Sequence, residues 1–306
     1  MVIDVQHLDK QYLKHKVIQD VSFQVRQGMI CGLIGPNGAG KTTIMKMLGG
    51  LVLQDSGSIT ILGKQTETGL AEARSRMSFV IETPYAKEDM SAWENLEKQR
   101  LQKGIPDKSI IENVLKIVGL EDVGKKKVKA FSLGMRQRFG IANALMTEPE
   151  IMILDEPING LDPEGIVEIR ELLLKLNREK NITIIISSHI LSELSLLCTD
   201  YIFIHHGQIL QAVSAPELKK ICREYYHIHT DNDPLACRIL KEKSGLTEFE
   251  IQQDGSIQLY ESLDQIREIS RTLYENNAIP LILHMSEVNL EQYYMNMIGT
   301  GGAQDA

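Results

Sequence analysis

The alternation of apolar and polar residues first predicts the strands of one large domain. Residues 1–28 contain two alternating stretches around a polar turn, which indicates an antiparallel hairpin with one buried face. Three later runs, MICGLIG at 29–35, IMILD at 151–155 and ITIIISS at 182–188, are almost continuously apolar. Such runs are typical of strands that are covered on both faces. We therefore expect a buried parallel sheet built from these three strands.

Helical patterns surround these strands. Ile166, Ile169, Leu173 and Leu176 repeat at helical spacing between the second and third runs, which predicts a right-handed strand-helix-strand unit. Residues from about 86 to 148 lack strand patterning and predict an inserted helical lobe. The fold class expected for residues 1–215 is therefore α/β, with an antiparallel β subdomain at its N-terminus.

The pattern restarts after residue 215 and predicts a small α+β domain over residues 220–298. Its expected strands are 225–230, 249–253, 256–261 and 279–285, and its expected helices are 233–243, 263–276 and 287–298. The order β-α-β-β-α-β fits a split-βαβ sandwich. Residues 299–306, GTGGAQDA, are expected to be a disordered tail.

Composition narrows the class of protein. The 33 Lys and Arg residues against 41 Asp and Glu give a formal net charge of −8, which argues against a general nucleic-acid binder. The four cysteines show no C-x-x-C spacing, so a metal or disulfide framework is not expected. No apolar run approaches the length of about 18 residues that spans a bilayer. A role at a membrane would therefore be that of a peripheral subunit.

A phosphate-binding loop follows the first apolar run. Its residues are Gly35, Pro36, Asn37, Gly38, Ala39, Gly40, Lys41 and Thr42, and Thr43 follows in the predicted helix as a further nucleotide-binding candidate. Glycines let backbone N–H groups wrap a phosphate, Lys41 supplies positive charge, and the Thr42 hydroxyl suits Mg²⁺. A chance match without nucleotide is the alternative. The position between a buried strand and a helix favours a nucleotide site.

Acidic residues and a histidine follow the other two buried strands. Asp155 and Glu156 end one strand at the edge where open α/β sheets bind ligands. Asp155 suits a water-mediated Mg²⁺ contact, while Glu156 is the candidate general base. The alternative is that the pair only caps the following turn. His189 ends the neighbouring strand and is a third candidate, with a purely structural histidine as its alternative.

The segment AFSLGMRQRFGIANAL, residues 130–145, predicts a second anion site. Ser132 has the position of a helix cap, and a helix N-terminus presents free N–H groups to an anion. Together with the motifs above, this segment resembles the ATP-binding subunit of ABC (ATP-binding cassette) transporters over residues 1 to about 215. That resemblance implies ATP and Mg²⁺ as ligands, a homodimer, and a permease on a separate polypeptide.

The resemblance also implies roles for individual residues. In head-to-tail dimers of this family, Ser132 and Gly134 would close over the γ-phosphate held by the partner chain. Tyr12 would stack on adenine, with hairpin packing as its alternative. Residues 159–162, ending at Asp162, would form the loop that crosses the dimer interface, and His189 would sense the γ-phosphate.

Two departures from the usual family motifs narrow the subfamily. The signature Leu-Ser-Gly-Gly-Gln reads Phe-Ser-Leu-Gly-Met at residues 131–135, and a glutamate, Glu82, replaces the usual glutamine. Both resemble bacitracin-resistance and lantibiotic-immunity ATPases. Glu82 is therefore a catalytic and metal-binding candidate, with an ordinary solvated loop residue as the alternative.

The expected function is an ATPase on the cytoplasmic face of the cell membrane that drives export of a peptide antibiotic. The rival is a soluble ABC ATPase acting on ribosomes or DNA, but the chain carries neither a second cassette nor a long coiled-coil or zinc-hook insertion. A phosphate-loop kinase would leave residues 130–145 without a role.

Overall fold

The computed structural model describes residues 1–81, 86–287 and 289–301. It divides into two compact units, residues 1–215 and 216–306. The first unit has two sheets and the second has one, and each unit has its own apolar core.

The first unit contains two sheets. Its strands are β1 (Ile3–Tyr12), β2 (His15–Val25), β3 (Ile30–Ile34), β4 (Ser56–Ile61), β5 (Met77–Val80), β6 (Ile151–Asp155), β7 (Thr183–Ser188), β8 (Asp200–His205) and β9 (Gln208–Ser214). Strands β2-β1-β4 form an antiparallel sheet, and β5-β6-β7-β3-β8-β9 form a second sheet that is parallel except for β9. Every residue of β3, β6 and β7 is buried, which confirms the covered parallel sheet predicted from their apolar runs.

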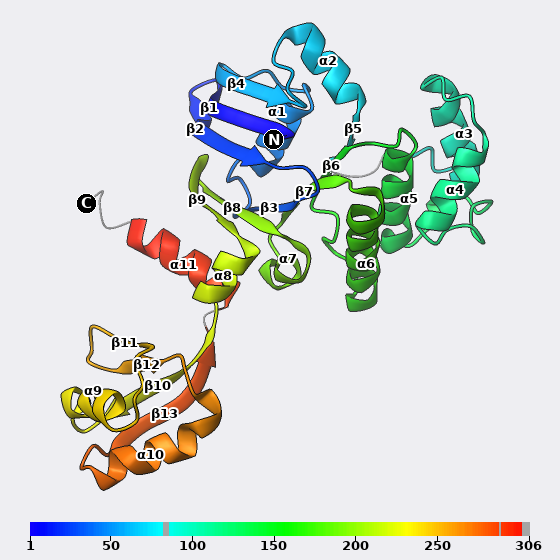
Figure 1. The fold of residues 1–306 in the computed structure, drawn as a ribbon. Helices are drawn as coiled ribbons and strands as arrows, with labels where there is room; N and C mark the ends of the chain where they lie inside the picture. The colour runs from blue at the N-terminus through cyan, green and yellow to red at the C-terminus, as the bar shows by residue number, and fades with distance from the viewer. Residues whose placement is uncertain (82–85, 288, 302–306) are drawn as a thin grey trace. The chain divides into compact units, whose positions relative to one another are not determined.

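Helices cover these sheets. They are α1 (Lys41–Leu48), α2 (Glu67–Ser75), α3 (Ala92–Gln102), α4 (Ser109–Ile117), the 3-10 helix η1 (Val128–Ala130), α5 (Leu133–Leu145), α6 (Pro163–Lys180), α7 (Leu191–Leu197) and α8 (Ala215–Ile221), which crosses into the second unit. Helices α3, α4 and α5 contact one another and form the predicted helical lobe (Figure 1). Helix α6 buries three of the four residues predicted to face the sheet, Ile169, Leu173 and Leu176, while Ile166 is half-buried. The helices thus cover the buried strands β3, β6 and β7, whose ends carry the phosphate loop, Asp155 and His189.

The second unit has the strand and helix order that the sequence predicts. Its elements are β10 (Glu224–Thr230), α9 (Asp233–Glu242), β11 (Phe249–Ile251), β12 (Ile257–Leu259), the 3-10 helix η2 (Leu263–Gln265), α10 (Ile266–Glu275), β13 (Pro280–Glu287) and α11 (Leu290–Gly301). The sheet order is β11-β12-β10-β13, all antiparallel. Apolar residues of α9 and α10 form one core with the strands.

The end of the second unit differs from the sequence-based expectation. The last helix was expected from residue 287, but β13 runs to that residue and α11 begins at Leu290. The Asn289 side chain accepts a hydrogen bond from the Gln292 backbone N–H at 2.8 Å, so it caps the helix there. The helix continues to Gly301, so residues 299–301 of the expected disordered tail are helical. Residues 302–306 lie outside the described residues.

The expectations from composition concern the cysteines, the metal-ligating side chains and the helix lengths. None of the four forms a disulfide in the described part of the chain. Burial raises the pKa of the Cys31 thiol to about 12, so this thiol stays protonated and weakly reactive. Within the described residues, no group of three or more His, Cys, Asp or Glu side chains is arranged to hold a metal ion. In the same part of the chain, no helix has both the length and the apolar character needed to cross a membrane.

The two units predict a tolerated truncation. A chain that ends at Lys220 keeps the complete core of the first unit, so it should fold and bind ATP with the affinity of the full chain. Near-ultraviolet circular dichroism and titration with a fluorescent ATP analogue would check this expectation. A truncated chain that is insoluble, or that has lost its near-ultraviolet signal, would contradict an independent first unit.

Candidate nucleotide site

The phosphate loop connects β3 to α1 and depends on glycine at two close approaches. Gly40 caps α1 with a φ of 108°, in the left-handed region that glycine adopts without strain. A Cβ atom at Gly40 would lie 2.5 Å from Ile18 Cδ1, and one at Gly35 would lie 2.3 Å from the Ile204 carbonyl oxygen. The loop is therefore held tightly against β2 and β8, while its N–H groups at the start of α1 form an anion site.

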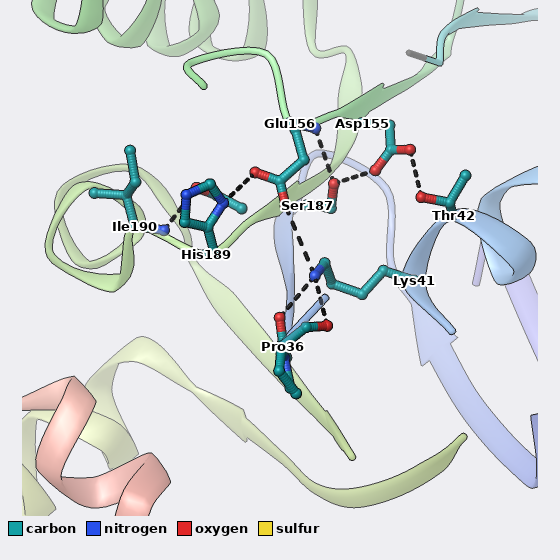
Figure 2. Close-up of polar contacts among 10 residues, drawn as sticks. Pro36, Lys41, Thr42, Asp155, Glu156, Ser187, His189 and Ile190 are labelled. Atoms are coloured by element: carbon teal, nitrogen blue, oxygen red, sulfur yellow. Dashed lines mark hydrogen bonds and ion pairs between the residues drawn. The ribbon is translucent and has the colours of Figure 1, made fainter. Parts of the chain in front are cut away.

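Lys41 places a buried positive charge at the centre of the loop. Its side chain is 6% exposed, and Nζ donates hydrogen bonds to the carbonyl oxygens of Gly35 at 2.6 Å and Pro36 at 3.1 Å. Nζ also lies 3.6 Å from Glu156 Oε1 (Figure 2). The ammonium group is thus fixed between the phosphate loop and the acidic end of β6.

Thr42 and Asp155 meet across the sheet edge. The Thr42 hydroxyl donates to Asp155 Oδ2 at 2.6 Å, and the Ser187 hydroxyl donates to Asp155 Oδ1 at 2.5 Å (Figure 2). The two carboxylate oxygens therefore have different partners, one from α1 and one from β7. Because Asp155 is 6% exposed and has two donors, its carboxylate is held in one orientation.

Glu156 follows in a strained conformation and faces His189. Its φ of 51° is unusual for a residue other than glycine. Oε2 lies 2.8 Å from His189 Nδ1, whereas Oε1 is buried and has no hydrogen-bond partner among the described residues. His189 follows β7, which pairs with β6 as its predicted place on the neighbouring strand requires. Its ring contacts Glu156, a pairing that the sequence did not specify.

The residues present suit ATP with Mg²⁺. Oxygen atoms of Thr42 and Asp155 are hard ligands of the kind Mg²⁺ prefers, and these two side chains lie next to Lys41 and the phosphate loop. Glu156 Oε1 is a buried acceptor beside the same loop, with no hydrogen-bond partner among the described residues and with Lys41 Nζ at 3.6 Å. Cation, metal ligands and acceptor therefore meet at a single sheet edge.

Ser132 and Gly134 lie in a second group with residues 159–162. The Ser132 side chain caps α5 by accepting from Met135 N at 3.3 Å, and an added Cβ at Gly134 would lie 3.8 Å from Leu161 Cδ2. Asp162 caps α6 by accepting from Gly165 N at 3.1 Å. Within the described residues, Ser132 and Gly134 make no hydrogen bond or ion pair with the phosphate loop of their own chain.

Three further candidates remain, of which two lie in the described part of the chain. Tyr12 ends β1 and is 44% exposed, and Lys10 Nζ lies over its ring, 5.5 Å from the ring centre. Thr43 is a half-buried residue of α1. Glu82 lies outside the described residues.

Sequence reasoning missed Ser187. The register of the parallel sheet places it opposite Asp155, with Leu33 of β3 on its other side. The signal was present in the sequence, because ITIIISS ends in two serines on the strand that precedes His189. Only the strand order β6-β7-β3 brings that hydroxyl to the carboxylate.

Known proteins resemble this chain in its first unit, and some of them over nearly its whole length. The ABC transporter family profile matches residues 18–159. A bacitracin transport ATP-binding protein of Bacillus licheniformis is 41% identical, covering 98% of each chain. A lantibiotic transport ATP-binding protein of Streptococcus pyogenes is 43% identical over 68% of this chain and 89% of its own. The solved structure of an ATP-binding subunit of an ABC transporter has a TM-score of 0.63 and 30% identity, covering 72% of this chain and 93% of that one.

These similarities agree with the strand order and the phosphate loop. The rival function on ribosomes or DNA receives no support from them. The chain belongs to the ATP-binding proteins of the ABC transporter family and is an ATPase.

Proposed function

We propose that this ATPase drives a separate membrane permease that transports a bacitracin-type peptide antibiotic. The observation that carries the proposal is the full-length similarity to the bacitracin transport protein, which extends through the second unit. The similarity to the lantibiotic transport protein covers only 68% of this chain. The bacitracin class is therefore favoured over the lantibiotic class.

In this proposal, the phosphate loop and Lys41 bind the phosphates of ATP. Thr42 and Asp155 would hold Mg²⁺, which neutralises phosphate charge when it is bound. Lys41 already has hydrogen bonds to Gly35 and Pro36, so little side-chain entropy remains to be lost when it meets a phosphate. Tyr12, with its exposed ring, is proposed to stack on adenine.

Glu156 is proposed to act as the general base. Oε1, which has no hydrogen-bond partner among the described residues and lies 3.6 Å from Lys41 Nζ, would accept a proton from the attacking water, while His189 holds Oε2 at 2.8 Å. His189 has a 43% exposed side chain, so it also remains accessible to the γ-phosphate that it is proposed to sense. The carboxylate is thus oriented by His189 at Oε2, while Oε1 has no hydrogen bond among the described residues to give up when it accepts the proton.

The second chain of a dimer is proposed to complete each site. Ser132, an exposed residue, and Gly134 lie at the N-terminus of α5, where N–H groups and the helix dipole favour an anion. Leu161 lies next to Gly134, so residues 159–162 would lie with this segment at the dimer interface. The location proposed for the dimer is the cytoplasmic face of the membrane, bound to the permease.

Antibiotic susceptibility tests the proposed substrate. Deleting this chain from its host should lower resistance to bacitracin, and a plasmid copy should restore it. A Lys41→Ala copy should fail to restore it, because ATP hydrolysis is lost, although Lys41→Ala protein accumulates to the same level. Unchanged bacitracin resistance in the deletion strain, together with increased sensitivity to the lantibiotic nisin, would replace the bacitracin class with the lantibiotic class.

A further inference from the structure

We propose that Ser187 is a positioning residue of the ATPase site, which aligns the metal-side carboxylate of Asp155 with the backbone of the base Glu156. The inference rests on the proposed roles of these two acidic residues. It assigns to β7 a part in hydrolysis that is separate from the part proposed for His189.

The hydroxyl of Ser187 is both a hydrogen-bond donor and a hydrogen-bond acceptor. It donates to Asp155 Oδ1 at 2.5 Å and accepts from the Glu156 backbone N–H at 2.9 Å. The same N–H lies 3.2 Å from the Ser187 carbonyl oxygen. Because an N–H group can only donate and an ionised carboxylate can only accept, the hydroxyl proton must point to Asp155. Its two neighbours therefore fix the hydroxyl rotation.

This bridge controls the orientation of Asp155. Thr42 holds Oδ2 and Ser187 holds Oδ1. Without the Ser187 hydroxyl, the carboxylate would be held at one oxygen only. Ser187 is 0% exposed, so water cannot readily replace the lost donor. Removing the hydroxyl should let the carboxylate turn and should weaken the Thr42–Asp155 arrangement that is proposed to hold the metal.

The bridge also holds Glu156 in its unusual backbone conformation. A φ of 51° costs free energy for a residue with a side chain and persists where surrounding contacts fix it. The Ser187 hydroxyl is an acceptor for the N–H of this residue, and His189 contacts its carboxylate from the same strand end. Strand β7 thus contacts the base at its backbone through Ser187, and His189, just after the strand, contacts its side chain.

The test compares Ser187→Ala with Ser78→Ala as a matched control. Ser78 is a buried serine of β5 in the same sheet, and its hydroxyl has no hydrogen-bond partner among the described residues. For each protein, the affinity for a fluorescent ATP analogue is measured in EDTA and across Mg²⁺ concentrations. Mg²⁺-dependent ATP hydrolysis is measured in parallel.

For Ser187→Ala, the affinity in EDTA should stay within about twofold of the parent, because Lys41 and the phosphate loop are intact. The Mg²⁺ concentration that gives half of the metal-dependent change in binding should rise by about tenfold, and kcat should fall by about tenfold or more. Ser78→Ala should match the parent in its affinity in EDTA, its half-maximal Mg²⁺ concentration and its kcat. In an Asp155→Asn background, Ser187→Ala should change the Mg²⁺ response much less, because the partner of its hydroxyl is altered.

A Ser187→Cys variant keeps the number of side-chain atoms and replaces the hydroxyl with a weak hydrogen-bonding group. It should show the same losses if Ser187→Ala proves unstable in thermal unfolding. A folded Ser187→Ala or Ser187→Cys protein with the Mg²⁺ response and kcat of Ser78→Ala would overturn the proposal. A parent protein whose hydrolysis does not depend on Mg²⁺ would instead overturn the proposed function of the site.

Discussion

Glu156→Gln should bind ATP but hydrolyse it at least about 10²-fold more slowly than the parent, a barrier increase of about 2.7 kcal/mol. The amide keeps the shape of the side chain but cannot accept the proton of the attacking water. Lys41 loses an ion pair at 3.6 Å, yet it keeps its bonds to Gly35 and Pro36, so the phosphate loop stays ordered. Single-turnover hydrolysis and equilibrium ATP binding measure the two effects separately.

A second consequence follows for the oligomeric state. If two ATP molecules join the chains and hydrolysis separates them, Glu156→Gln should accumulate an ATP-dependent dimer in size-exclusion chromatography with light scattering. Glu179→Gln is the matched control, because Glu179 is an exposed residue of α6 away from the sheet edge, and it should hydrolyse ATP like the parent. Unchanged turnover in Glu156→Gln would reject the role of general base.

The sequence predicts those parts of the site that depend on local chain order. The phosphate loop lies between a buried strand and a helix, and both units have the expected strand patterns. Ser132 caps α5 as its position in the sequence suggests, because capping is a contact between near neighbours. Contacts of this kind are set within a few residues and can be recognised without a structure.

Contacts that depend on strand order could not be predicted in the same way. The sequence predicted that His189 follows the strand next to Asp155, which the structure bears out, but not that its ring contacts Glu156, a residue with a positive φ. Ser187 bridges residues that lie more than 30 positions away in the chain. Apolar runs predict that β6 and β7 are buried, but they do not specify which hydroxyl faces which carboxylate.

Composite sites predict that two inactive variants recover activity when they are mixed. Gly134→Asp should bind ATP on its intact phosphate loop but should fail to hydrolyse it, because the new carboxylate would oppose the γ-phosphate held by the partner. The substitution should leave the fold intact: an added Cβ would meet Leu161 at an ordinary 3.8 Å, and an acidic residue is favourable in the first turn of a helix. Lys41→Ala should be inactive through its own phosphate loop while keeping a normal signature segment.

In a heterodimer of these two chains, one site combines the intact phosphate loop of Gly134→Asp with the intact signature segment of Lys41→Ala. Random pairing at equal concentrations makes half of the dimers heterodimers with one of two sites restored, so the mixture should reach about a quarter of parent activity if the sites act independently. A chain that carries both substitutions, mixed with Lys41→Ala, should give none, because no pairing then joins two intact halves. If heterodimers form by native mass spectrometry but no mixing ratio restores hydrolysis, Ser132 and Gly134 must serve the ATP of their own chain.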